Sequence, residues 1–209
     1  MNVLSRTTKL PCPSFALPAR ASCAGLREAE RIISRGEAGD GGSICGRCYA
    51  FRLASFRPRL REVEFQRFAW YKRALARGSA AQELVDSIKA TGANIFRLFS
   101  SGDFHSIKSI ETWIKVAKAL PGVRFYAPTR TYVLKAFLPA LRRLHALPNV
   151  SVRPSALTVD QEAPIIKGLG DGTRVVRRGH TCPATDQNNE CGECRLCFDK
   201  TGVIAYKAH

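Results

Sequence analysis

The order of apolar and polar positions predicts short strands that alternate with helices in the middle of the chain. Apolar runs begin at Asn94, Val123 and Val150, and each leads into a polar loop. After the first run, residues 106–120 carry apolar side chains at helical spacing, on one stripe. Strands and helices in this regular order are typical of βα units, which are right-handed and build a parallel sheet. We therefore expect an α/β fold, in the form of a partial (β/α) barrel with parallel strands.

Further elements are predicted on both sides of this core. Beyond Pro58 the pattern is helical, and Gly78 breaks it. Ser79 and Gln82 fit a capping box, which would open a second helix that extends to about residue 90. Towards the other end of the chain, residues 173–178 are the candidate for a last strand.

The segment 51–77 is both basic and aromatic. It has eight basic residues against Glu62 and Glu64, and aromatic side chains are interleaved with them: Phe56, Phe65, Phe68, Trp70 and Tyr71. In a nucleic-acid interface the arginines would contact phosphates and the rings would stack on bases. In an amphipathic helix the rings would lie in the core and the arginines in solvent. The sequence leaves both interpretations open.

The composition is that of a globular protein. The 209 residues are 45% hydrophobic and 24% charged, which excludes a disordered tail or a low-complexity scaffold. We expect a single domain over residues 1–209. It would consist of an N-terminal cysteine segment (1–50), an α/β core (51–178) and a C-terminal cysteine segment (179–209).

The charge points to an anionic partner. The formal net charge is +16, and 23 of the 33 basic residues are arginines. Arginine binds carboxylate or phosphate groups through two parallel hydrogen bonds. We expect an anionic or zwitterionic small molecule as ligand, or else a nucleic acid. The start of the chain does not fit a secretory signal, and the sequence lacks a run of about 18 apolar residues, so we expect no membrane partner and a cytoplasmic location.

Eight cysteines lie in two sets near the ends of the chain, with none between residues 48 and 182. The sets are Cys12, Cys23, Cys45 and Cys48, then Cys182, Cys191, Cys194 and Cys197. In a reducing compartment such cysteines are better candidates for metal or cluster ligands than for disulfides. We therefore predict that all eight are metal ligands.

The spacing of the second set favours an iron–sulfur cluster. Cys191, Cys194 and Cys197 form a CxxCxxC motif, whose three thiolates can occupy three corners of a [4Fe-4S] cube while a fourth ligand comes from farther away. Zinc is the alternative, because the pair Cys45 and Cys48 could join Cys191 and Cys194 in a tetrahedral site across the fold. That arrangement would leave Cys197 without a role as a ligand. We expect one or two [4Fe-4S] clusters, with zinc as the alternative cofactor.

Polar residues follow the predicted strands where they end. Asp103 comes after the first strand, Arg130 after the second and Arg153 at the end of the third, while Arg97 lies within the first strand. The carboxyl ends of parallel strands carry the ligand site in α/β proteins. We predict that these four residues bind the ligand, the alternative being that they only form caps and turns.

Several motifs together resemble a known family. They are LPCPSFALPARASC, SICGRCYAF, FRLFSSGDF, FYAPTRTY and CGECRLCF, and they are similar to the gene product 88 family of bacteriophages. The resemblance implies a phage-encoded protein that acts in the cytoplasm of the bacterial host. It also suggests an iron–sulfur centre held by the terminal cysteines.

A more distant resemblance is to radical S-adenosylmethionine enzymes, which combine a partial barrel with a four-iron cluster at the strand carboxyl ends. This sequence lacks their CxxxCxxC loop, because Cys23 lies far upstream of Cys45. The expected function is that of an iron–sulfur protein with a ligand site at the strand ends, in a redox or ligand-binding role. A radical S-adenosylmethionine-like enzyme and a basic nucleic-acid-binding protein with structural zinc are the alternatives.

Overall fold

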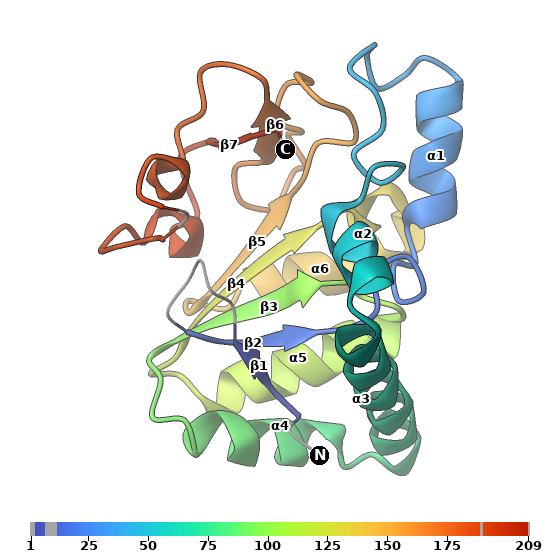
Figure 1. Ribbon diagram of the computed structural model, residues 1–209. Helices are drawn as coiled ribbons and strands as arrows, with labels where there is room; N and C mark the ends of the chain where they lie inside the picture. The colour runs from blue at the N-terminus through green and yellow to red at the C-terminus, as the bar shows by residue number, and fades with distance from the viewer. Residues whose placement is uncertain (1–2, 7–11, 189, 209) are drawn as a thin grey trace.

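A sheet of five strands forms the centre of the computed structural model, which describes residues 3–6, 12–188 and 190–208. Its strands lie in chain order, as Figure 1 shows: β1 (Ser5–Arg6), β2 (Pro13–Ala16), β3 (Ile95–Ser101), β4 (Arg124–Thr129) and β5 (Val150–Pro154). The short edge strand β1 is antiparallel to β2, and the other four strands are parallel. The predicted parallel α/β core is therefore confirmed.

Helices connect the parallel strands and pack on one face of the sheet. They are α3 (Pro58–Arg77), α4 (Ala80–Lys89), α5 (Ile107–Ala119) and α6 (Leu138–His145). Between sheet and helices lies the main apolar core, in which Phe15 of β2 packs against Trp113 of α5 with ring centroids 5.4 Å apart. Phe96 and Val152 point into the same core because alternate strand residues face one side.

A second, two-stranded parallel sheet continues the series. It pairs β6 (Thr173–Val176) with β7 (Ile204–Lys207), and a bridge from Ser155 to Thr173 joins it to the end of β5. The fold is therefore α/β, with four parallel strands in sequential order and helices on one side of the sheet. The strand predicted at 173–178 is confirmed over Thr173–Val176, but it is not the last strand, because β7 follows it.

The remaining elements are short. They are α1 (Leu26–Ser34), α2 (Tyr49–Phe56) and four 3₁₀ turns: η1 (Thr131–Val133), η2 (Lys135–Phe137), η3 (Pro183–Thr185) and η4 (Leu196–Phe198). The periodicity of the sequence did not reveal β1, β2, β7, α1 or α2. None of the helices in the described part of the chain has the length and apolarity needed to cross a membrane.

The helix boundary at residues 78 and 79 is confirmed, but the predicted capping box is wrong. Gly78 ends α3 in the left-handed conformation with φ 80°. Ser79 precedes α4 without a side-chain capping bond, because its hydroxyl bonds Glu83, and Gln82 instead donates to Asp86 at 2.8 Å. The side chains of the expected box therefore bind along the helix.

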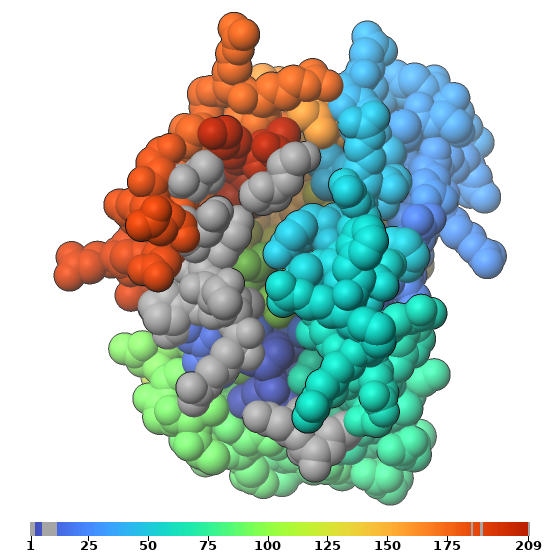
Figure 2. Space-filling model, in the orientation of Figure 1, coloured from blue at the N-terminus to red at the C-terminus, as the bar shows by residue number. Residues whose placement is uncertain are grey.

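The other face of the sheet is polar. Its side chains include Ser14, Arg97, Tyr126, Ser151 and Arg153, which alternate with the core residues along their strands. The C-terminal segment covers this face near β4 and β5, and α2 lies against the loop that follows β2 (Figures 1 and 2).

Candidate metal centres

All eight cysteines are free thiols, and strand β2 divides the N-terminal ones between two places. Cys12 directly precedes β2, whereas Cys23 follows it, so the two lie at opposite ends of the strand. Because β2 and β3 are parallel, one end of the sheet collects the residues before the strands and the other end collects those after them. We call Cys12, Cys182, Cys191, Cys194 and Cys197 the first thiol group, and Cys23, Cys45 and Cys48 the second thiol group.

The first thiol group consists of the four cysteines of the C-terminal segment and Cys12, which lies beneath that segment. Cys12 is buried and packs in one apolar cluster with Cys191, Cys197, Tyr126 and Phe198. Burial raises the pKa of the Cys12 thiol to about 11, and Cys191 adds to the rise, while Arg97 opposes it. Burial likewise raises the pKa of Cys191, with further contributions from Cys197 and the other C-terminal thiols. The thiols of this group therefore lie close enough to oppose one another's ionisation.

Arg97 is the main cation beside the first thiol group, and Arg153 and Arg195 add to its effect. Its charge favours the ionised forms of Cys12, Cys191 and Cys197, against the burial that raises their pKa values. The guanidinium lies over the ring of Tyr126, 5.9 Å from its centroid. Its Nε is buried without a hydrogen-bond partner among the described residues. Arg97, predicted as a ligand-binding residue, thus lies beside thiols rather than at the carboxyl end of its strand.

Two tyrosines border the same thiols. The hydroxyl of Tyr206 is 3.5 Å from Sγ of Cys197 and 2.8 Å from the hydroxyl of Tyr126. Burial raises the pKa of both phenols, so both keep their protons at neutral pH. Tyr206 can therefore donate a hydrogen bond to the sulfur.

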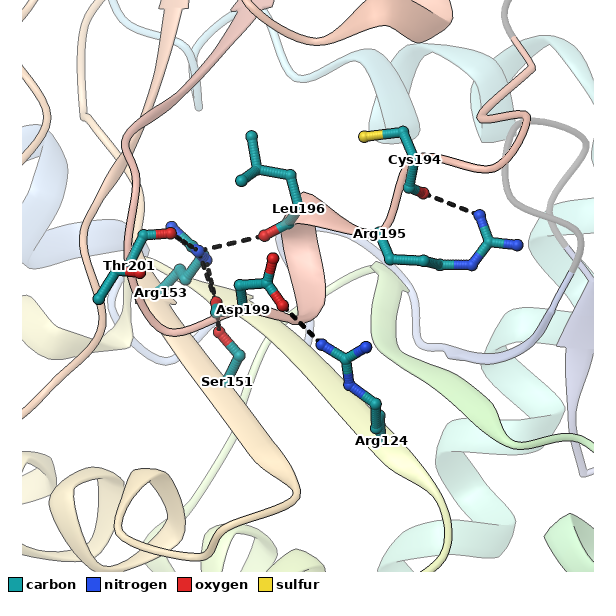
Figure 3. Close-up of polar contacts among 8 residues, drawn as sticks. All are labelled: Arg124, Ser151, Arg153, Cys194, Arg195, Leu196, Asp199 and Thr201. Atoms are coloured by element: carbon teal, nitrogen blue, oxygen red, sulfur yellow. Dashed lines mark hydrogen bonds and ion pairs between the residues drawn. The ribbon is translucent and has the colours of Figure 1, made fainter.

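Arg153 anchors the C-terminal segment to the sheet (Figure 3). Its side chain is fully buried, and all three of its nitrogens donate to backbone carbonyls. The acceptors are those of Asp171, Leu196, Asp199, Thr201 and Gly202. Since Asp199 and its neighbours flank Cys197, this anchor positions the loop that carries the CxxCxxC motif. The guanidinium predicted to bind a ligand is thus fully engaged by the protein's own backbone.

The second thiol group lies at the carboxyl ends of the strands. Burial raises the pKa of Cys23 to about 12, and the nearby charges of Asp103, Cys45 and Cys48 add to the rise. Burial also raises the pKa of Cys45, which the guanidinium of Arg130 opposes. The turn that carries the CxxC pair is closed by a hydrogen bond of 3.3 Å from the Cys48 amide to the Cys45 carbonyl. Three thiols, one carboxyl group and one guanidinium therefore meet here.

Asp103 holds the loops of this site together. Its carboxylate accepts hydrogen bonds from the Thr129 hydroxyl and the Phe104 amide at 2.7 Å, and from the Arg130 amide at 2.8 Å. The side chain is buried, which raises its pKa despite these bonds. The loops after β3 and β4 are thereby joined, and Arg130 is fixed beside Cys45. The prediction that Asp103 and Arg130 share one mouth of the sheet is consistent with this geometry.

Arg130 has N–H donors that are available to a ligand. Its Nε donates to the Ala156 carbonyl at 2.9 Å, and for its two terminal nitrogens no hydrogen bond is found within the described ranges 3–6, 12–188 and 190–208. Its charge acts on Cys45 and Tyr132. Of the four arginine and aspartate side chains predicted to bind a ligand, Arg130 is the one whose position at the strand ends suits that task.

Close backbone approach brings the loops of the second thiol group together. Gly102 has φ +78°, and a Cβ atom there would lie 2.3 Å from Oγ of Ser22 and 2.9 Å from Leu17. The loop after β3 can therefore pass against the loop before Cys23 only with glycine at this position. The glycine in the SGDF motif is the sequence signal for this contact.

Comparison with protein families identifies the chain. The family model for gene product 88 matches residues 2–177. The chain belongs to the gene product 88 family. No curated protein and no solved structure matches it. The match to gene product 88 includes the whole second thiol group and Cys12, and it ends before Cys182.

The donor chemistry of this gene product 88 chain suits a thiolate-bound metal or cluster. In the described part of the chain, however, no group of three or more His, Cys, Asp or Glu side chains is arranged closely enough to hold a metal ion. The thiols are neighbours rather than preformed ligand sets. The structure does not bring together the two pairs of the alternative zinc site, since Cys45 and Cys48 belong to the second thiol group and Cys191 and Cys194 to the first.

Proposed function

We propose that this gene product 88 protein binds iron–sulfur clusters through its two thiol groups and takes a small anionic or zwitterionic ligand at the strand carboxyl ends. The division of eight free thiols into a group of five and a group of three carries the proposal. Cluster ligation requires thiolates, and neither group contains a disulfide that would compete for them.

The first thiol group would hold a [4Fe-4S] cluster. Cys191, Cys194 and Cys197 provide three ligands from one loop, and Cys12 or Cys182 provides the fourth. Such a cluster supplies one-electron redox chemistry. Arg97 offsets its negative charge, and Tyr206 donates to the sulfur of Cys197.

The second thiol group would hold a cluster or metal ion with one coordination position left for a ligand, since it has three thiols. Arg130 would bind the carboxylate of that ligand through its terminal nitrogens. Asp103 acts as a positioning residue, because its carboxylate accepts hydrogen bonds from Thr129 and from the amide of Arg130. Arg153 is left out of the proposed ligand site, because its guanidinium is used within the protein.

Metal analysis of anaerobically purified protein tests this proposal. We expect iron and acid-labile sulfide, with absorbance near the ~400 nm band of thiolate-bound clusters. Cys194→Ala should remove the iron of the first group and Cys48→Ala that of the second, so each variant should lose part of the metal. Ser34→Ala, on the exposed side of α1, is the matched control and should keep all of it.

Two results would overturn the assignment. Stoichiometric zinc with no iron would show that the thiols serve a structural metal. Iron content that both cysteine variants leave unchanged would show that the thiol groups are not the ligands.

The three-thiol composition of the second group also favours a second candidate, a radical S-adenosylmethionine-like enzyme. An iron with an open position is what that chemistry needs, and the group lies at the strand carboxyl ends. The measurement is binding of S-adenosylmethionine and its cleavage after reduction with dithionite. Absence of both in iron-loaded protein rejects this candidate and leaves the cluster-binding proposal standing.

A further inference from the structure

The surface of α2 and the start of α3 displays aromatic rings to solvent. Phe51, Phe56 and Phe65 are 43%, 79% and 45% exposed, whereas Trp70 and Tyr71, farther along α3, are buried. The two interpretations of the basic, aromatic segment therefore apply to different parts of it. The second half is an amphipathic helix that packs in the core, and the first half leaves its rings partly exposed to solvent.

Arginines surround these rings. The side chains exposed on this stretch include Arg47, Arg52, Arg57, Arg59 and Arg61. The sequence has no acidic residue between Asp40 and Glu62. The surface therefore combines a run of arginines with partly exposed aromatic rings.

A pocket opens within this surface, between α2, α3 and the loop that follows β2. Its volume is about 250 Å³, and Arg20, Phe51, Arg61, Glu64 and Phe65 line it. Two arginine–aromatic pairs stand in its wall, with Arg20 5.1 Å from the ring centroid of Phe51 and Arg61 5.9 Å from that of Phe65. This volume lies just below the range of about 300–1,000 Å³ for drug-sized ligands, so it suits a single planar ring system.

Glu64 gives the pocket a buried acceptor. Its side chain is 3% exposed, and Oε2 has no hydrogen-bond partner among the described residues. Burial raises the pKa of this carboxyl group to about 7, although Ser101 and Arg67 oppose the rise. Arg67 donates its hydrogen bonds to backbone carbonyls instead, including that of Ala16 at 2.8 Å. A ligand with N–H donors would satisfy the carboxyl oxygen that the protein leaves unpaired.

The backbone of the pocket is strained at one point. Arg20 adopts φ +67°, a left-handed conformation that is uncommon for residues with a side chain. This conformation occurs in the loop that places the Arg20 guanidinium over Phe51. Strain of this kind is concentrated at ligand sites.

We propose that α2, the first turns of α3 and this pocket bind single-stranded nucleic acid. One unpaired base enters the pocket and stacks with Phe51 and Phe65, and Glu64 accepts a hydrogen bond from its edge. The arginines contact the phosphates on either side. Single strands fit better than duplexes because stacking on exposed rings requires bases that are not already stacked. This inference is independent of the thiol groups and of the cluster proposed for them.

Binding is measured with the full chain by fluorescence anisotropy, using a labelled mixed-sequence single-stranded DNA of about 12 nucleotides. We expect tighter binding to this strand than to the same sequence as a duplex. The logarithm of the affinity should fall linearly with the logarithm of the salt concentration. Free mononucleotides and polyglutamate should compete only weakly.

Matched variants locate the site. Phe51→Ala and Phe65→Ala should each weaken binding roughly 5- to 100-fold, whereas Ile165→Ala, which removes an exposed apolar side chain elsewhere, should not. Arg61→Gln should reduce the salt slope by about one, and Arg77→Gln at the far end of α3 should leave it unchanged. Glu64→Gln should change the order of preference among homopolymer strands. Thermal unfolding of each variant verifies that it is folded.

Several outcomes would overturn the proposal. They are equal affinity for duplex and single strand, full competition by a mononucleotide or by polyglutamate, and an affinity that the two phenylalanine variants leave unchanged. The first would indicate binding to phosphates alone. Competition by a mononucleotide would indicate a site for a free nucleotide.

Discussion

The hydroxyl groups of Tyr126 and Tyr206 are joined by a hydrogen bond of 2.8 Å. Tyr126 belongs to β4 of the central sheet and Tyr206 to β7 of the small sheet, so the bond links the two sheets. Tyr206 also lies 3.5 Å from the sulfur of Cys197. Tyr126 can donate to Tyr206 while Tyr206 donates to the sulfur, which makes a short chain of donors that ends at a thiol.

Tyr206→Phe removes the donor to Cys197. In protein loaded with a cluster, we expect a lower reduction potential, because hydrogen bonds to ligand sulfurs stabilise the reduced, more negative state. A redox titration followed by electron paramagnetic resonance measures the shift. Tyr71→Phe is the control, since its hydroxyl contacts Ser109 at 3.1 Å and lies outside the first thiol group. An equal shift in both variants would contradict the role given to Tyr206.

Arg153→Met should release the C-terminal segment. The change leaves several buried carbonyls without their charged donor, and we expect the free energy of unfolding to fall by about 3 kcal/mol or more. Limited proteolysis should then cut between residues 179 and 203 faster than in the unmodified protein. Arg124→Gln removes the ion pair of 2.7 Å to Asp199, but both partners are about half exposed, so its cost should stay below about 1 kcal/mol. Similar losses in the two variants would show that Arg153 is not the main anchor.

Gly102→Ala tests the close approach beside the second thiol group. The positive φ and the 2.3 Å distance from the added Cβ to Ser22 should lower the free energy of unfolding by about 1–3 kcal/mol. Chemical denaturation measures the change. At Gly122 the same substitution meets no described atom within 4 Å, and it should be neutral or slightly stabilising. If both alanine variants are equally stable, the contact with Ser22 does not require glycine.

Glu64 should make stability depend on pH. Its pKa is raised to about 7 in the folded protein from an ordinary value of 4.5, so the folded state holds the proton more tightly than the unfolded state. The stabilising effect of that proton is complete below about pH 4.5 and is lost as the pH rises through 7. We expect a loss of at most about 3 kcal/mol. Glu64→Gln should flatten this part of the curve, as measured by urea denaturation from pH 4 to pH 8; an unchanged slope would contradict the prediction.

The core of the fold could be predicted because its strands and helices are long enough to show a period. Residues 107–119 form a helix with one apolar stripe, and the apolar run from Val150 is a strand buried along its whole length. Strand β2 was not predicted, because four residues next to prolines are too few to show the alternation of apolar and polar positions. Strand β7 was not predicted because it follows an irregular cysteine loop. Short elements such as these take their conformation from neighbouring strands rather than from their own sequence.

The partition of the thiols could not be predicted from spacing. Cys12 and Cys23 are close in sequence, yet one lies before and the other after a strand that was not recognised. The neighbours of Arg97 could not be predicted either, because they depend on the register of β3 with β2 and β4. Asp103, Arg130 and Arg153 were all placed at strand ends by sequence, but the backbone contacts that occupy Arg153 come from the C-terminal segment and could not be foreseen.

Strand β2, with four residues and a length of about 13 Å, separates Cys12 of the first thiol group from the loop that leads to Cys23 of the second. Ligands at one end therefore cannot replace ligands lost at the other, and each centre would be assembled and dismantled by itself. Oxygen or a chelator that removed the iron from the more open centre would leave the iron of the other centre in place. If both proposed clusters are bound, their visible absorbance would then decay in two phases with different rates. A chain that had lost one cluster would still hold the other.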